Sequence, residues 1–86
     1  MKLKKKLILR TIAGDNLLVP IGEAVNVFNG VFTISPSAAV VYQALLDGLD
    51  EDEILGRVLK EFEVDEETAK KDIEEFLDQL REFDII

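Results

Sequence analysis

The segment VDEETAKKDIEEFLDQLREFDII, residues 64–86, carries apolar side chains at the spacing of an amphipathic helix. The apolar stripe consists of Ala69, Ile73, Phe76, Leu77, Leu80 and Phe83. Asp65 stands at a suitable N-cap position, and Glu66 and Glu67 follow in the first turn, where the helix dipole favours negative charge. The pattern predicts a helix over 65–83, about 28 Å long, which can line one side of an entire small domain.

Two shorter helices are predicted directly before it, over 36–47 and 51–62. Ser35 is suited to cap the first of them, because its hydroxyl can accept a backbone hydrogen bond and the following proline fits the first helical position. Asp50, followed three residues later by Glu53, has the spacing of a capping box at the start of the second helix. Each helix has its own apolar stripe, so we expect the three helices to pack on one another.

The first third of the chain is rich in residues that favour β-strands. Residues 6–13 and 17–21 are separated by Gly-Asp-Asn, which predicts an antiparallel hairpin. A second hairpin is predicted over 24–34, because the Asn-Gly pair in its centre is the preferred pair for a type I′ turn. Three strands joined by a long bend would satisfy the same pattern. We therefore expect three to four strands within residues 6–34.

The predicted order is a small antiparallel sheet followed by three helices. This order indicates an α+β fold similar to a winged helix-turn-helix domain with its sheet placed first. A chain of 86 residues can bury one modest core. We expect residues 1–86 to form a single domain.

The composition excludes many functions. The chain has no cysteine and no histidine, which removes thiolate nucleophiles, imidazole bases and the usual zinc and haem ligands. No paired-carboxylate spacing, phosphate-binding glycine loop or nucleophile elbow is present either. We therefore expect a protein that is not an enzyme and has no cofactor or metal.

The charge of the chain is unevenly distributed. Residues 1–49 carry five basic and three acidic side chains, whereas residues 50–86 carry five basic and fifteen acidic ones. The acidic half would repel a phosphate backbone, so we expect no nucleic-acid partner. No apolar run approaches the length of a membrane span, and no cleavage-site pattern follows the basic start of the chain, so we expect a cytoplasmic protein without a membrane partner.

Three segments of the second half resemble a known family. They are Leu46-Asp47-Gly48, Glu53-Ile54 and above all DIEEFLDQL at 72–80. This last segment is similar to the Asp-Ile/Val-x-x-Phe-Leu-x-x-Leu pattern of the D protein of pyrroloquinoline quinone biosynthesis and of the wider PqqD-like family. With the Asn-Gly and Ile-Ser pairs upstream, the resemblance extends over nearly the whole chain.

The resemblance implies a function. Members of the PqqD-like family are peptide-binding modules, called recognition elements of ribosomally synthesised and modified peptides (RiPP recognition elements). The family resemblance implies a three-stranded sheet before three helices, and a leader peptide that adds as an extra strand at the edge of the third strand. It further implies that the third helix completes the groove and that the peptide is delivered to a modifying enzyme, commonly a radical S-adenosylmethionine (radical SAM) protein.

Two segments differ from the quinone-pathway members of the family. Those members carry Tyr-Pro-Glu-Gly in the second strand and Leu-Asn before the first helix. This chain has Val19-Pro20-Ile21-Gly22 and Ile34-Ser35 at these places. We therefore expect a member of the broad family in a pathway other than that of the quinone.

The candidate peptide-binding residues lie in the third strand and on the facing helix. They are Val31, Phe32, Thr33, Ile34, Ala69, Lys70, Ile73 and Leu77. The strand would supply backbone pairing, the small Ala69 would leave room for a bulky ligand side chain, and Lys70 with its neighbour Lys71 would hold an acidic residue of the peptide. Replacing Phe32 by proline is expected to remove a donor from the free edge.

A purely structural role is an alternative for each of these residues. Ile73 and Leu77 can be plain core, and core is the stronger expectation for Phe76, Leu80 and Phe83. Lys70 and Lys71 can form helix-surface ion pairs with Glu66 and Glu67, four residues earlier. Asp72 can orient a partner or simply be solvated.

Two other functions compete with peptide binding. A DNA-binding winged helix would need a basic recognition helix, but residues 65–84 hold nine acidic side chains against Lys70, Lys71 and Arg81. A structural or oligomerisation domain would pair with its own copy through the same sheet edge. The sequence is compatible with a monomer or a homodimer.

Overall fold

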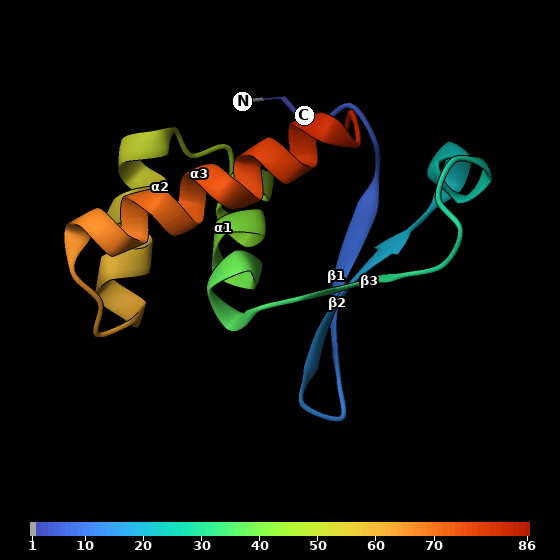
Figure 1. Cartoon of the computed structure of the whole chain (residues 1–86). Helices are drawn as coiled ribbons and strands as arrows, with labels where there is room; N and C mark the ends of the chain where they lie inside the picture. The colour runs from blue at the N-terminus through green and yellow to red at the C-terminus, as the bar shows by residue number, and fades with distance from the viewer. Residues whose placement is uncertain (1) are drawn as a thin grey trace.

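The computed structural model describes residues 2–86 and consists of a three-stranded antiparallel sheet followed by three helices (Figure 1). The elements are β1 (Leu7–Ile12), β2 (Asp15–Pro20), the 3-10 helix η1 (Gly22–Asn26), β3 (Phe32–Ile34), α1 (Pro36–Leu46), α2 (Glu51–Glu61) and α3 (Glu66–Glu82). The predicted α+β order is confirmed.

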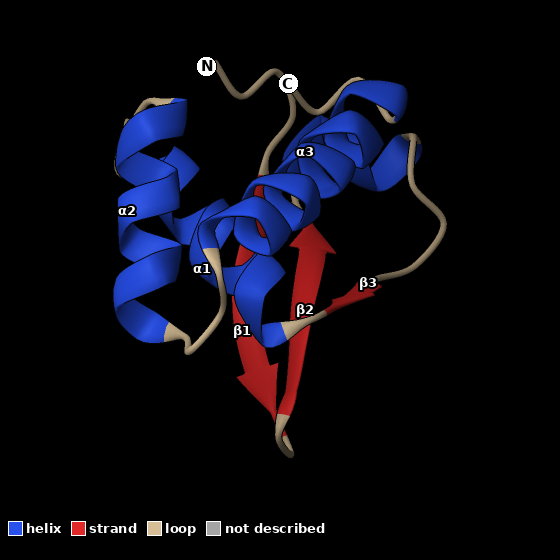
Figure 2. Ribbon diagram, turned by 60° about the vertical axis from the view of Figure 1, so that its left-hand side comes forward, coloured by secondary structure: helices blue, strands red, loops and turns tan. Residues whose placement is uncertain are grey.

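The sheet has the order β1-β2-β3, and the helices lie on one of its faces (Figure 2). Leu9 of β1, Leu18 of β2 and Phe32 of β3 stand opposite one another across the sheet and all belong to the hydrophobic core. Leu18 is only 2% exposed. The sheet therefore contributes one wall of the core, and its two outer strands are β1 and β3.

The first predicted hairpin is present, with its turn one residue earlier than expected. Ile12 pairs with Asp15, so the two turn residues are Ala13 and Gly14. Both have positive φ, at 52° and 84°, as a type I′ turn requires. Pro20 is the last residue of β2, where its missing N–H costs no hydrogen bond within the sheet.

The second predicted hairpin is not formed. Residues 24–28, predicted as a strand, instead contribute to η1 and to the loop after it, and the alternative of three strands with a long bend is the one observed. Gly30 has a φ of 105°, but Asn29 is not in the left-handed region, so this pair makes no type I′ turn. The chain leaves the sheet at Gly22, whose φ is 60°, and Ala24 then anchors η1 with only 4% exposure.

The three helices begin at the predicted caps and end within one residue of the predicted bounds. The Ser35 hydroxyl accepts a hydrogen bond from the Ala38 N–H, and the Asp65 carboxylate accepts one from the Thr68 N–H at 3.2 Å. Asp50 and Glu53 form a reciprocal capping box with distances of 2.9 and 3.1 Å. These local side-chain bonds explain why the helix starts could be predicted.

The core lies between the sheet and the helices. Tyr42 of α1, Ile54 of α2 and Leu77 of α3 are each 0% exposed. Phe76 and Leu80 are buried as expected, but the expectation that Phe83 is a core residue is wrong, because it is 45% exposed. Within residues 2–86, no helix has both the length and the apolar character that crossing a membrane demands.

Candidate functional site

The pairing of β1 with β2 determines which backbone groups of β2 face β3. The Ile21 N–H donates to the Lys6 carbonyl at 3.1 Å, and the register places these two residues opposite each other. Neighbouring residues of a strand direct their N–H and C=O groups to opposite sides of the strand. Odd-numbered residues of β2 therefore bond to β1, and the even-numbered Asn16 and Leu18 face β3.

This alternation identifies the open backbone groups of β3. Leu18 stands opposite Phe32 and Asn16 opposite Ile34, so the N–H and C=O groups of Phe32 and Ile34 point toward β2. The N–H and C=O of Thr33, between them, point outward from the sheet. No strand among residues 2–86 pairs with that side of β3. The expected effect of Phe32→Pro was assigned to the wrong residue, because the donor at the free edge is the Thr33 N–H.

The opposite edge of the sheet contacts α1 at the start of β1. By the same alternation the Leu7 carbonyl points away from β2, and the Tyr42 hydroxyl donates to it at 2.9 Å. Tyr42 is fully buried, and this burial raises the pKa of its hydroxyl, which keeps the donor protonated. The β1 edge is thus bonded to a helix side chain at Leu7, whereas the β3 edge has the outward-facing backbone groups of Thr33 beside α3 and the β3–α1 segment.

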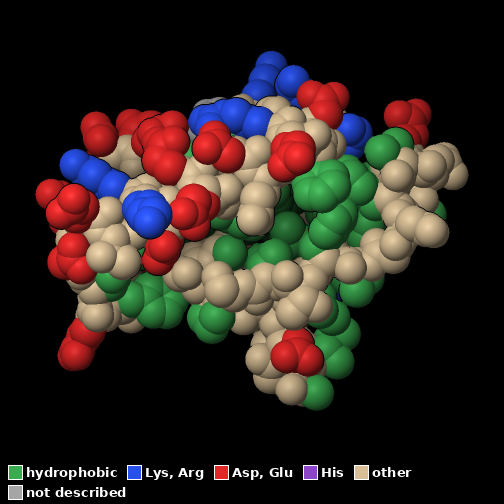
Figure 3. All heavy atoms as spheres, viewed as in Figure 1, with side chains coloured by type: hydrophobic (Ala, Val, Ile, Leu, Met, Phe, Trp, Pro, Cys, Tyr) green, Lys and Arg blue, Asp and Glu red, His purple; other side chains and the backbone are tan. Residues whose placement is uncertain are grey.

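A groove of about 530 Å³ lies beside the open edge, between the β3–α1 segment on one side and α3 on the other. In Figure 3 it is a hollow below α3 with hydrophobic side chains at its base. Six buried side chains from three helices line it, namely Ala38, Val41, Val58, Ala69, Ile73 and Phe76. Half-buried Ile34, Phe62 and Val64 complete the apolar lining. The groove therefore joins an unsatisfied backbone edge to an apolar floor.

The rim of the groove on α3 is polar. Asp72, Glu75 and Gln79 line it and are exposed, at positions three and seven residues apart on one side of the helix. Asp72 was singled out by the sequence, but Glu75 and Gln79 were not. The sequence did indicate that Glu75 and Gln79 lie beside the apolar stripe, because of their spacing from Ile73 and Phe76. It did not indicate which side of that stripe faces β3.

The structure places the predicted binding residues in three different settings. Thr33, Ile34, Ala69 and Ile73 are brought together around the groove. Leu77 is 0% exposed and absent from the groove lining, so its prediction as a contact residue is corrected to core. The physical reason is that Leu77 belongs to the cluster of fully packed core residues.

Lys70 does not line the groove. It is exposed and lies 4.0 Å from Glu66 in the expected ion pair of residues four apart. Such an exposed pair contributes little to stability. The helix-surface alternative for Lys70 is therefore the arrangement present in the structure, and its contact with an acidic residue of the peptide stays a prediction.

Val31 and Phe32 line a second, neighbouring hollow rather than the main groove. The ring of Phe32 packs against those of Phe28 and Phe83, with ring centroids 5.2 and 5.3 Å away. These three aromatic rings connect the start of β3 to the end of α3. They hold the two walls of the groove together at this end.

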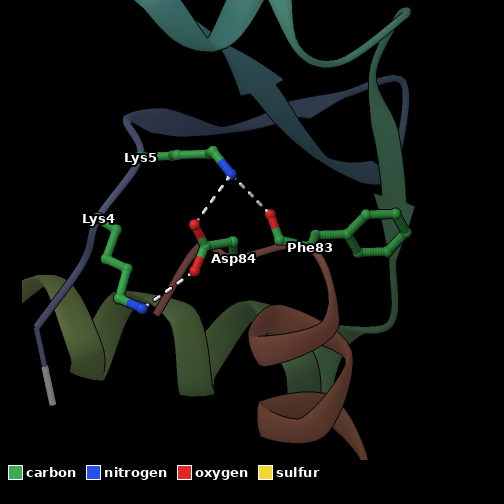
Figure 4. A network of polar contacts seen from close by, with 4 residues as sticks. All are labelled: Lys4, Lys5, Phe83 and Asp84. Carbon is green, nitrogen blue, oxygen red and sulfur yellow. Dashed lines mark hydrogen bonds and ion pairs between the residues drawn. The ribbon is translucent and has the colours of Figure 1, made fainter.

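The chain termini reinforce this end of the molecule (Figure 4). Lys5 donates to the Phe83 carbonyl at 3.0 Å and lies 5.5 Å from the centre of the Phe28 ring. Lys4 forms an ion pair with Asp84 at 3.0 Å and lowers the pKa of that carboxyl. The basic start of the chain thus packs against the end of α3.

No group of three or more carboxylates within residues 2–86 is arranged to hold a metal ion. The Asp47 carboxylate accepts hydrogen bonds from Arg57 at 2.7 Å and from Gln43 at 3.1 Å. These bonds lower the pKa of the Asp47 carboxyl.

The fold and groove define a class of small domain in which a free antiparallel strand edge borders an apolar groove, open to an added strand. The family model described as coenzyme PQQ synthesis protein D (PqqD) matches residues 9–86. The chain therefore belongs to the PqqD family, as the resemblance of its second half predicts.

Other comparisons concern individual proteins. No curated protein sequence matches the chain significantly. Among solved structures, TbiB1 in complex with the TbiA(beta) leader peptide is similar, with a TM-score of 0.75 and 20% sequence identity. The similarity covers 99% of this chain and 93% of that one. At this identity the likeness demonstrates a shared fold.

Proposed function

We propose that this protein is a non-catalytic, cytoplasmic peptide chaperone. In this proposal the leader region of a ribosomally made precursor peptide adds to the sheet as a fourth strand, next to β3. The protein then presents the bound peptide to a modifying enzyme, which we propose to be a radical SAM protein. The main observation in support of this proposal is that the N–H and C=O of Thr33 face outward beside the apolar groove. Membership of the PqqD family supports the proposal.

The physical basis of binding is the pairing of backbone groups. An extended peptide can satisfy the open edge whatever its side chains, while every second side chain points into the groove. The stretch of α3 from Ala69 to Gln79 is about 15 Å long, which corresponds to four or five residues of extended peptide at about 3.3 Å each. Backbone bonds then supply affinity and the apolar floor supplies selectivity.

The test is a titration of the isotope-labelled protein with synthetic leader peptides from precursor genes adjacent to its own. Amide shifts are expected to cluster on residues 33–41 and 69–79. Thr33→Pro removes the outward N–H, and the loss of one backbone hydrogen bond, about 1 kcal/mol, should weaken binding roughly fivefold to tenfold.

The chain offers a matched control for this variant. Thr11 of β1 also faces outward by the same alternation, but on the other edge of the sheet. Thr11→Pro should therefore leave the peptide affinity within about twofold of the parent. Equal losses in both variants, or shifts that cluster outside the groove, would contradict the proposal.

The competing function is self-association through β3. It predicts a dimer whose formation is prevented by Thr33→Pro and not by Thr11→Pro, measured by light scattering in the absence of peptide. This competing function would be excluded if the protein is a monomer and the NMR signal of the Thr33 amide shifts only when peptide is added.

A further inference from the structure

We propose that the groove selects a leader segment carrying a lysine or arginine between apolar residues, an inference that rests on the proposed function. Among residues 2–86, the only charged side chains that line the groove are Asp72 and Glu75. Both lie on the α3 rim, above the buried Ile73 and Phe76. An occupant of the groove would thus meet an apolar floor and a negatively charged border.

The two carboxylates have no neutralising partner in the described part of the chain. Within 4.0 Å of Asp72 or Glu75 there is no lysine or arginine nitrogen among residues 2–86. Lys70 is directed to Glu66, and Lys71 forms no ion pair with Glu75 four residues later. The rim is therefore free to pair with a cation that the ligand brings.

The opposite wall offers no positive charge to balance the rim. It is formed by Thr33, Ile34, Ser35, Ser37 and Ala38, and the two serine hydroxyls lie 3.2 Å apart. These groups can accept or donate hydrogen bonds but cannot neutralise an acidic ligand. An acidic residue in the bound segment would stand beside two carboxylates, whereas a basic one would be attracted to them.

Geometry restricts the cation to a long side chain. Asp72 and Glu75 are three residues apart, about 4.5 Å along the helix axis, near the middle of the groove. A bound strand directs alternate side chains toward the floor, so the charged group must reach the rim from the strand backbone. Lysine and arginine have apolar stems that can lie along the floor while the charged end reaches the carboxylates.

The net negative charge of the chain also favours a cationic peptide, but this attraction is separate from the contact with the groove rim. The chain has a net charge of −8, which attracts any cationic peptide at long range. A local preference must therefore be separated from this general attraction. The exposed Glu67 and Glu74 allow this, because they lie on α3 outside the groove lining and form no ion pair within 4.0 Å among the described residues.

The experiment begins with a displayed library of random twelve-residue peptides, selected on the purified protein. The retained peptides are expected to alternate apolar residues and to be enriched in lysine and arginine over aspartate and glutamate. A fluorescent copy of one retained peptide then serves as the probe for the variants.

The double variant Asp72→Asn with Glu75→Gln is compared with Glu67→Gln with Glu74→Gln, which changes the net charge equally. Each exposed ion pair lost at the rim should weaken binding about threefold, so the rim variant should bind about tenfold more weakly. The control variant should change affinity by less than about twofold, and the difference should shrink in 0.5 M salt, where screening is strong. Urea unfolding of both variants verifies that each is folded.

Two outcomes overturn the preference for a cation while leaving strand addition intact. One is a set of retained peptides that bind in the groove but carry acidic or no charged residues. The other is an equal effect of the rim and control variants. A selection that returns no peptide binding at β3 and α3 would overturn both this inference and the proposed function.

Discussion

Replacement of Tyr42 by phenylalanine tests the argument that α1 is bonded to the backbone of the edge strand β1 at Leu7. The Tyr42 hydroxyl donates to the Leu7 carbonyl at 2.9 Å, and the side chain is 0% exposed. Phenylalanine keeps the buried ring and removes only the hydroxyl. The Leu7 carbonyl would then be left in the interior without its donor.

The expected magnitude follows from this geometry. A buried acceptor that loses its partner costs about 1–3 kcal/mol, and ring packing should change little. A domain of 86 residues has a total stability of about 4–13 kcal/mol, so the loss is a substantial fraction of it. We expect the melting temperature to fall by about 4–24 °C, at about 4–8 °C for each kcal/mol.

Urea unfolding of the parent and Tyr42→Phe proteins measures the change. The midpoint should decrease while the dependence on urea stays the same, since the surface exposed on unfolding is unchanged. The carbonyl carbon resonance of Leu7 should shift. The affinity for a groove-binding peptide should stay within about twofold, because Tyr42 does not line the groove.

The pH dependence supplies a second readout. Burial raises the pKa of the Tyr42 hydroxyl above the ordinary value for tyrosine, about 10, in the folded protein. The stability from its protonated hydroxyl is thus fully present below the unfolded pKa and is lost as the pH rises through the folded one. The parent should therefore lose more stability than Tyr42→Phe above about pH 10. A stability loss below about 0.5 kcal/mol at neutral pH, with no shift at Leu7, would refute the hydrogen bond between Tyr42 and β1.

Three further predictions concern residues whose roles the structure assigns. Leu77→Ala should reduce the stability by about 2–5 kcal/mol in urea unfolding, because Leu77 is 0% exposed; a loss below about 1 kcal/mol would place it outside the core. The hydrogen bonds from Thr68 lower the pKa of the Asp65 carboxyl, so the stability that this carboxylate contributes is present above its unfolded pKa and is lost as the pH falls through its folded pKa. When the pH is lowered from about 6 to about 2.5, Asp65→Ala should therefore lose less stability than the parent. Equal acid sensitivity of the two proteins would contradict this prediction. Phe83→Ala should destabilise the protein by about 1–2 kcal/mol through its contacts with the rings of Phe28 and Phe32. Hydrogen exchange should rise more at Phe32 than at Arg10, whose N–H bonds to β2; uniform changes would indicate a global effect.

Local patterns in the sequence were sufficient for the helices. The caps at Ser35, Asp50 and Asp65 act on backbone groups three residues away, and the apolar stripe of α3 repeats with the helical period. The motif at 72–80 likewise identified the family. These features depend on neighbours along the chain, so they are readable without knowledge of the tertiary contacts.

The site itself depended on contacts between distant segments. The backbone groups at the open edge are those of Thr33 and not those of Phe32. This follows from which residues of β2 bond to β1, and the sequence does not reveal that alternation. The Asn29-Gly30 pair was misleading because the packing of η1 and of Phe28 overrides its local turn preference.

By itself, the sequence determined the three helices, the first hairpin and the family. Tertiary structure alone decided that Tyr42 bonds to the β1 edge, that the Thr33 backbone faces outward on the β3 edge, and that Asp72 and Glu75 border the groove. The physical reason is range: capping and periodicity act within a few residues, whereas strand phase and helix orientation are set by packing between segments that are remote along the chain.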